Sequence, residues 1–154
     1  MSTHSIIGIK IPHGSFLTIY CHNEGGLEHN GEILSKHYND VDKITALIHG
    51  GDISILGSEI GEKHSFDERV RDYHRAEWAD WTLFYHRDRE EPLHGCKTRV
   101  HASEEAFIKD GDDCLAKFVY LWDDGKWGYL ERRTENASDK FQSLKDALEN
   151  INSR

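Results

Sequence analysis

Two short stretches carry the side chains best suited to chemistry in this sequence. The first ends in Tyr20-Cys21-His22, and the second, residues 81–89, joins aromatic side chains to a histidine and two arginines. Arginine binds phosphate through two parallel hydrogen bonds, and aromatic rings stack on bases. If the two stretches lie at the ends of neighbouring strands, they form one pocket for a nucleotide or a phosphorylated small molecule. The predicted ligand-binding residues are Tyr20, His22, Trp81, Tyr85, His86, Arg87 and Arg89.

The same residues allow two other interpretations. Arg87 could pair with Glu90 or Glu91 in a solvated loop and bind nothing else. Alternatively, His22 and His86 could act as acid and base in an enzyme that hydrolyses nucleotide signals. The sequence offers so many pairings of cysteine with histidine that none of them identifies a nucleophile, and we therefore assign no catalytic residue.

Motifs of the common cofactor and metal enzymes are absent from the sequence. It contains no GxGxxG, no GxxxxGK followed by Ser or Thr, no GxSxG and no HExxH. A zinc site would need ligands from distant segments, such as His22 and His86 with Cys96 or His101, and no spacing supports that combination. We therefore predict neither a cofactor nor a metal site.

Composition limits the classes of partner. The formal net charge is −9, because 28 acidic residues outweigh 19 basic ones, which disfavours extended binding to nucleic-acid phosphates. The excess of acids leaves acidic mimicry of nucleic acid as a further alternative. Three cysteines without CxxC spacing fit a reducing compartment. No apolar run approaches the ~20 residues of a membrane helix, and no signal peptide is recognisable, so we expect a cytoplasmic protein without a membrane partner.

The elements that must position these side chains can be predicted from local patterns. Residues 5–11 and 15–22 read as a β-hairpin, with Leu17, Ile19 and Cys21 on its core face. Helical spacing follows over residues 27–38 and, after an N-cap at Asp40, over residues 41–48. Further expectations are an irregular helix over 68–78, strands over 81–86 and 98–101, and a short helix from Ser103 to about Lys109.

Residues 116–132 form the clearest supersecondary element. Asp124-Gly125 is typical of a two-residue type I′ turn, which pairs Trp122 with Trp127 and Tyr120 with Tyr129. The resulting aromatic face is either core or an interface with a partner or a second subunit, since Trp and Tyr are enriched in both places. The candidate interface residues are Tyr120, Trp122, Trp127 and Tyr129.

A last helix follows Ser143, so the order is hairpin, helices, strand, helix, hairpin and helix. This order predicts a single α+β domain over residues 1–154. We expect a mainly antiparallel sheet, built from two hairpins and a central strand, with helices packed on one face.

Several segments resemble a group of small accessory proteins encoded by tailed bacteriophages and prophages. The likeness is carried by residues 20–26 (YCHNEGG), 37–39 (HYN), 51–57 (GDISILG), 85–90 (YHRDRE) and 120–127 (YLWDDGKW). Asn23 departs from the group, which has an aromatic residue there, and so does Glu90, before which the group has glycine. The resemblance implies a phage gene product that acts in the cytoplasm of the bacterial host, where such genes often antagonise host defence.

The residues and the resemblance together lead to one main hypothesis. The protein would be a non-enzymatic binding protein that counters host defence. It would do so either by sequestering a small nucleotide signal or by blocking a host or defence protein.

Overall fold

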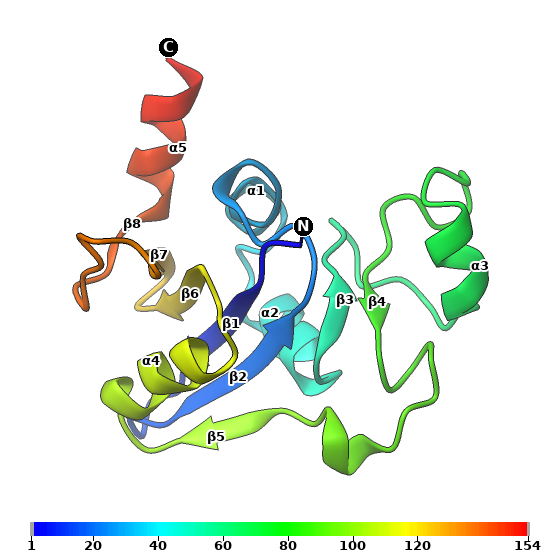
Figure 1. Ribbon diagram of the computed structural model, residues 1–154, viewed down its shortest axis with the longest axis horizontal. Helices are drawn as coiled ribbons and strands as arrows, with labels where there is room; N and C mark the ends of the chain where they lie inside the picture. Colours follow the sequence, from blue (N-terminus) through cyan, green and yellow to red (C-terminus); the bar gives the residue numbers. More distant parts are fainter. Residues whose placement is uncertain (1, 154) are drawn as a thin grey trace.

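A computed structural model describes residues 2–153, and its strands join one mixed sheet (Figure 1). The strand order is β4-β3-β2-β1-β6-β7-β8, and β5 also pairs with β2. Within the described residues no helix is long and apolar enough to cross a membrane. The strands are β1 (Ser5–Lys10), β2 (Phe16–Cys21), β3 (Ile53–Ile55), β4 (Leu83–Phe84), β5 (Arg99–His101), β6 (Phe118–Asp123), β7 (Lys126–Glu131) and β8 (Gln142–Ser143). The helices are the π-helical turn η1 (Leu27–Gly31), α1 (Glu32–His37), α2 (Val41–His49), α3 (Phe66–Arg71), the 3-10 turn η2 (Leu93–Gly95), α4 (Glu104–Asp113) and α5 (Leu144–Asn152).

Both predicted hairpins are present, and the second has the predicted register. β1 pairs antiparallel with β2, and β6 pairs antiparallel with β7. In the second hairpin Trp122 lies opposite Trp127 and Tyr120 opposite Tyr129. The turn residues Asp124 and Gly125 have φ values of 54° and 76°, the left-handed conformation that a type I′ turn requires at both positions.

Side-chain caps begin the longer helices where the sequence predicts them. The side chains of Asp40, Ser103 and Ser143 accept hydrogen bonds from backbone N–H groups in the first turns of α2, α4 and α5. α4 continues past the predicted end and includes Gly111. A Cβ at Gly111 would lie 3.0 Å from Val119 Cγ2, so the bare glycine lets the helix approach β6 closely.

The α+β class is confirmed, whereas the sheet is mixed and not mainly antiparallel. β1 pairs parallel with β6, and β2 pairs parallel with β3. Both parallel pairs join strands that are distant in the sequence, and no local pattern encodes such pairings.

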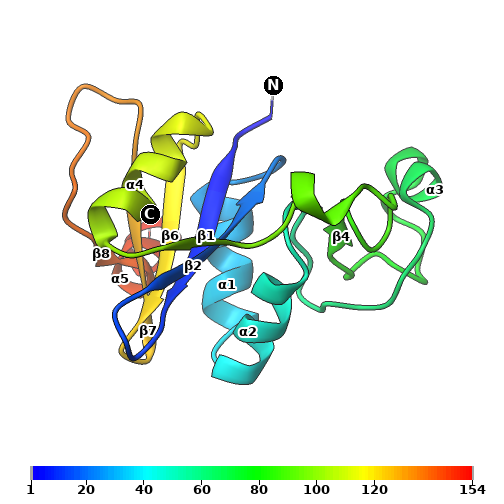
Figure 2. The same cartoon turned by 90° about the horizontal axis from the view of Figure 1, so that it is seen from below.

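Helices cover both faces of the sheet and not only one (Figure 2). α1, α2 and α5 pack on the face that carries Ile7, Ile19 and Cys21, which is the predicted core face. α4 covers the opposite face, where Phe107 and Ile108 meet residues of β1, β2 and β6. β1 and β6 lie between the two hydrophobic layers, and their side chains are buried on both sides.

The aromatic face of the second hairpin belongs to the core. Tyr120, Trp122 and Trp127 are buried against the α1, α2 and α5 layer. The Tyr120 hydroxyl donates to the Gly25 carbonyl at 2.7 Å, and this bond consumes its polar group inside the core. The interface hypothesis therefore does not hold for these three residues, because no partner reaches them. Only Tyr129 of the predicted interface set is partly exposed.

The segment between β3 and β5 differs most from expectation. The predicted strand over 81–86 is reduced to Leu83–Phe84, and the predicted helix over 68–78 is α3, which ends at Arg71. Much of this segment is irregular and is held by side-chain bonds to its own backbone, so hydrophobic periodicity carries little information about it.

Gly8 on β1 allows α4 to pack closely on the sheet, and this gives a testable prediction. A Cβ at Gly8 would lie 2.5 Å from Cε1 of Phe107, whose ring is fully buried and stacked on Phe16. We expect Gly8→Ala to lower the free energy of unfolding by about 2 kcal/mol in urea denaturation, because the buried ring has no free space to enter. Gly95→Ala is the control, since a Cβ there meets nothing within 4 Å. Equal losses in the two variants would contradict this account.

Candidate functional site

The predicted ligand-binding residues lie on β2 and around β4, and β3 separates the two strands. Tyr20 and Tyr85 flank Asp52, the residue before β3. The Asp52 carboxylate accepts a hydrogen bond from the backbone N–H of Tyr20 at 2.8 Å. The backbone carbonyl of Asp52 accepts one from the backbone N–H of Tyr85 at 3.2 Å. The two tyrosines therefore lie in one row across three strands.

Tyr20 and His22 form a small aromatic cluster with His4. The Tyr20 hydroxyl lies 2.8 Å from His22 Nδ1, and the rings of His4 and His22 stack with centroids 4.7 Å apart. Burial, followed by the neighbouring Tyr85, raises the pKa of Tyr20 to about 12, so its hydroxyl stays protonated. Burial, followed by His4, lowers the pKa of His22, which favours its neutral form. A neutral imidazole and a protonated phenol suit hydrogen bonding better than charge recognition.

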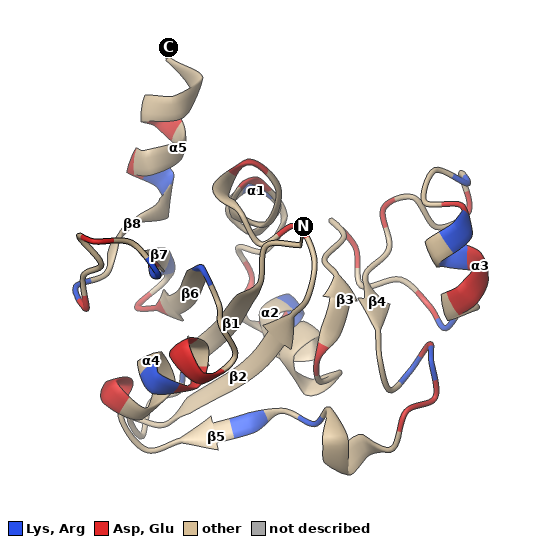
Figure 3. Ribbon diagram, in the orientation of Figure 1, with Lys and Arg blue, Asp and Glu red and all other residues tan. Residues whose placement is uncertain are grey.

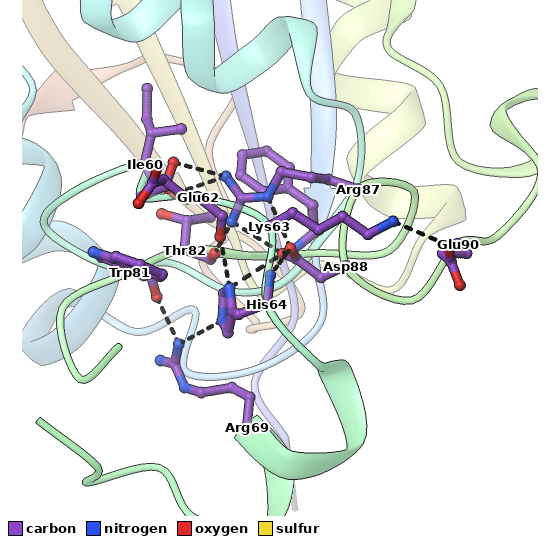
Figure 4. A network of polar contacts seen from close by, with 12 residues as sticks. Ile60, Glu62, Lys63, His64, Arg69, Trp81, Thr82, Arg87, Asp88 and Glu90 are labelled. Atoms are coloured by element: carbon purple, nitrogen blue, oxygen red, sulfur yellow. Dashed lines mark hydrogen bonds and ion pairs between the residues drawn. The ribbon is translucent and has the colours of Figure 1, made fainter. Parts of the chain in front are cut away.

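Arg87 is fully engaged by the protein itself (Figure 4). Its Nε and Nη2 donate to the two carboxylate oxygens of Asp88 at 2.9 and 3.0 Å. The other Nη2 hydrogen goes to the Thr82 carbonyl, and Nη1 donates to the carbonyls of Ile60 and Gly61. A guanidinium has five N–H donors, and all five are used, so none remains for a phosphate.

The other three predicted residues around β4 point to separate environments. His86 contacts the Glu91 carbonyl through Nδ1 at 2.7 Å. Trp81 packs edge-on against His64, with ring centroids 5.3 Å apart. Arg89 is half-exposed and lies over the Phe66 ring at 5.1 Å. The seven predicted residues therefore do not converge on one pocket.

A groove of about 580 Å³ lies beyond the carboxyl ends of the parallel strands β2 and β3. Its floor is the chain that leaves β3, residues 55–58. One wall is the face of η1 and α1 that carries His29, Ile33 and His37, and the other wall comes from α3 and the loop after it. Ligands of open sheets with parallel strands commonly bind beyond the carboxyl ends of the strands.

Arg69 is the distinctive residue of this groove. It lies in α3 and is only 3% exposed, yet no carboxylate of residues 2–153 forms an ion pair with it. Nη1 donates to the Trp81 carbonyl at 2.9 Å and lies 3.4 Å from Nε2 of His64 (Figure 4). Nε is buried without an acceptor, and Nη2 donates to no other described residue. Because Nε and Nη2 share one edge of the planar guanidinium, Arg69 keeps a complete two-donor edge unused.

Electrostatics point to an anion at Arg69. Burial lowers the pKa of Arg69, because the attraction of Tyr73, Asp88 and Asp80 only partly offsets the cost of removing its charge from water. Tyr73, which is 37% exposed, and His74 lie on the same wall of the groove. The groove can therefore hold one anionic group on the arginine edge and present an aromatic side chain beside it.

Nothing in the spacing of Arg69 distinguishes it in the sequence, and it is not among the predicted ligand-binding residues. It stands in a polar stretch without periodicity, beside Arg71 and Arg75, which are both exposed. Figure 3 shows acidic positions in the first turn of α3 and basic positions in its last turn, the usual arrangement along a helix dipole, so charge pattern does not single out Arg69 either. Only its burial identifies it.

A second polar cluster was also missed and ties α4 to the sheet. Arg99 on β5 donates through Nε to Asp110 of α4 at 2.7 Å and through Nη1 to Asp52 at 3.1 Å. His101 lies 2.7 Å from the same Asp110 oxygen, and the Cys114 thiol lies 3.3 Å from the other. Burial, followed by Asp110, raises the pKa of Cys114 to about 11, so this thiol is a poor nucleophile at neutral pH.

Metal binding finds no support in the geometry. Across residues 2–153, no group of three or more His, Cys, Asp or Glu side chains is arranged to hold an ion. The eight-residue spacing of His29 and His37 places them two turns apart along one wall of the groove.

Comparison of this chain with protein-family models, with curated proteins and with solved structures finds no match. The geometry of the groove is therefore the basis for a functional proposal.

Proposed function

We propose that this protein binds a small anionic ligand, of the nucleotide class, in the groove beyond β2 and β3, and that it sequesters the ligand without converting it. The ligand's anionic group lies against the free edge of Arg69. The aromatic ring of Tyr73 offers a surface for the base. The resemblance of residues 20–26 and 51–57 to phage accessory proteins supports a role in the bacterial cytoplasm against a host signal.

One observation carries the proposal: the buried Arg69 has no acceptor at Nε, and the adjacent Nη2 bonds no described residue. Leaving donors of a buried cation unpaired is costly, and nearly all buried polar groups have partners. A bound phosphate would supply two oxygens to that edge and remove the cost. The remaining bonds of Arg69, to Trp81 and His64, already fix the plane of the guanidinium in the wall of the groove.

Sequestration is favoured over hydrolysis by the state of the histidines in the groove. A general base needs a partner that orients its ring and holds it against the attacking group. Three histidines line the groove. In residues 2–153 the rings of His37 and His74 make no hydrogen bond, and the ring of His29 contacts only the side-chain amide oxygen of Asn30, through Nδ1 at 3.0 Å, and no carboxylate. His22 and His86, the pair considered for acid–base chemistry, are each engaged by their own neighbours.

Ligand depletion tests this proposal. The protein is mixed with cyclic mononucleotides, cyclic dinucleotides and ADP-ribose, the mixture is ultrafiltered, and the retained fraction is heat-denatured and analysed. We expect at least one compound to be depleted from the filtrate and to be recovered intact from the retained fraction after denaturation. Recovery of an altered compound would indicate an enzyme, and no depletion of any compound would contradict the proposal.

Matched variants locate the site. Arg69→Lys is expected to weaken binding roughly 10- to 100-fold, because lysine cannot offer two parallel donors. Arg69 also bonds Trp81, so the folding of this variant must be checked by circular dichroism. His74→Ala removes an exposed side chain from the same wall, and His94→Ala removes an exposed one elsewhere. Weaker ligand binding in His74→Ala and unchanged binding in His94→Ala would support the groove as the site. Equal effects of the two substitutions would contradict it.

A further inference from the structure

The charges around the groove suggest which anions it accepts, an inference that rests on the proposed function. Arg69 is the only lysine or arginine that lines the groove in residues 2–153, while Glu24 and Asp80 bring two carboxylates to it. We propose that the groove selects a ligand with a single phosphodiester charge over nucleotides with di- or triphosphate groups.

The unused edge of Arg69 matches a phosphodiester in number and geometry. A phosphodiester has two non-bridging oxygens and one negative charge, and Nε–H with Nη2–H presents two parallel donors and one positive charge. One guanidinium therefore satisfies such a group completely. The remaining nitrogen, Nη1, is engaged by the protein, because it donates to the Trp81 carbonyl.

Additional phosphates would find no cation. Polyphosphate sites use a lysine, a metal ion or several arginines to neutralise each added charge. Here the other charged side chains at the groove are the exposed Glu24 and Asp80, and no hydrogen bond or ion pair of residues 2–153 neutralises either carboxylate. A di- or triphosphate tail would lie in the field of these two acids, and like charges repel most strongly at low ionic strength.

Size and shape agree with a ligand as small as one nucleotide. A volume of about 580 Å³ falls within the roughly 300–1,000 Å³ of small-molecule sites. Ile33 and Ile55 give the groove apolar surface between the arginine wall and the η1–α1 wall, and the half-exposed ring of Tyr73 stands beside Arg69. An unphosphorylated nucleoside could contact these surfaces but would leave the arginine edge unpaired.

Isothermal titration at low salt tests this selectivity. The titrants are 3′,5′-cyclic AMP, AMP, ATP and adenosine, together with the matching guanine series and inorganic phosphate. We expect the cyclic nucleotide of one series to bind at least about tenfold more tightly than its triphosphate, and the nucleoside to bind more weakly than the cyclic form. Binding of ATP or GTP as tight as that of the cyclic form would overturn the inference and leave the proposed function intact. No binding by any titrant would overturn both.

A charge-reducing variant gives an independent readout. The double substitution Glu24→Gln with Asp80→Asn removes both carboxylates, which have no structural bonds of their own among the described residues. We expect it to tighten triphosphate binding about three- to tenfold at low salt and to tighten binding of the singly charged cyclic nucleotide by less, because repulsion grows with the charge of the ligand. Glu62→Gln, an exposed acid outside the groove, is the control. An unchanged ratio of triphosphate to cyclic affinity in the double variant would also overturn the inference.

Discussion

Replacing Arg87 with alanine is expected to lower the free energy of unfolding by about 3–5 kcal/mol. The substitution removes five hydrogen bonds and leaves the Asp88 carboxylate, whose side chain is fully buried, without its cation. It also frees the carbonyls of Thr82, Ile60 and Gly61 that Arg87 now holds together. The connection between the segments before and after β4 would be weakened, because it would then rest mainly on the bonds that Asp88 accepts from the backbone N–H groups of His64 and Phe84 (Figure 4).

Chemical denaturation with urea measures this loss, and the neighbouring arginine provides the control. Arg89 is 52% exposed, lies 3.5 Å from Glu91 and stacks over the Phe66 ring at 5.1 Å, so Arg89→Ala should change stability by no more than about 0.5 kcal/mol. Arg87→Lys should recover little, since lysine cannot reproduce a planar fork of five donors. Arg87→Ala with wild-type stability would show that the network does not hold this segment.

Replacing Asp110 with asparagine is expected to cost about 3 kcal/mol at neutral pH. Asp110 is the shared acceptor of Arg99 and His101, and its side chain is 9% exposed. The amide would turn an N–H toward one of two donors and would leave Arg99 with Asp52 as its single counter-ion. The loss lies at the low end for a broken buried pair because Asp52 remains.

The pH dependence of this loss has a definite sign. Burial alone would raise the pKa of Asp110, but hydrogen bonds from Arg99 and His101 hold it below its usual value. A carboxylate with a lowered pKa in the folded state contributes stability that is complete above the unfolded pKa of about 3.9 and is lost as the pH falls through the folded value. The difference between wild type and Asp110→Asn should therefore be full at about pH 7 and should shrink below about pH 4.

Asp52→Asn is the matched control for this second prediction. Burial raises the pKa of Asp52 despite the nearby Arg99, so the charge of Asp52 contributes less to stability than the charge of Asp110, whose pKa is lowered. An asparagine oxygen can still accept the Tyr20 N–H, and we expect a change below about 1 kcal/mol. Urea denaturation of both variants from about pH 7 to about pH 3.5 decides the matter. A larger loss at Asp52 than at Asp110 would contradict the assignment.

The candidate site shows that residue type alone does not identify the arginine with free hydrogen-bond donors. Two arginines, Arg69 and Arg87, lie eighteen positions apart in one polar region. The aromatic residues near Arg87 favour it as the phosphate ligand when only the sequence is considered. In the structure, backbone carbonyls and Asp88 accept hydrogen bonds from all five N–H donors of Arg87. Arg69 keeps Nε and Nη2 without an acceptor among the described residues. Which arginine has free donors depends on where the backbone carbonyls of residues 60–82 fall, and no local pattern encodes their positions.

The fold divides in the same way between local and distant information. Hairpins and caps were predictable because turn residues and side-chain oxygens act on neighbours within a few positions. The helix boundary at Gly111 was wrong because its glycine serves packing against Val119 and not termination. The parallel pairs were not predictable, since β1 and β6 are separated by about a hundred residues.

Tyr20 and His22 illustrate both contributions in one strand. Local patterns predict the strand that ends at these residues, the common face of their side chains and the glycine-rich turn that follows, because alternation and turn chemistry involve near neighbours. Long-range packing places β3 between them and Tyr85, α4 over part of their face, and Asn23 in the lining of the groove. These features follow from strand order and helix placement, which depend on burying two apolar faces at once. A buried guanidinium acquires its chemical role only after that packing is complete.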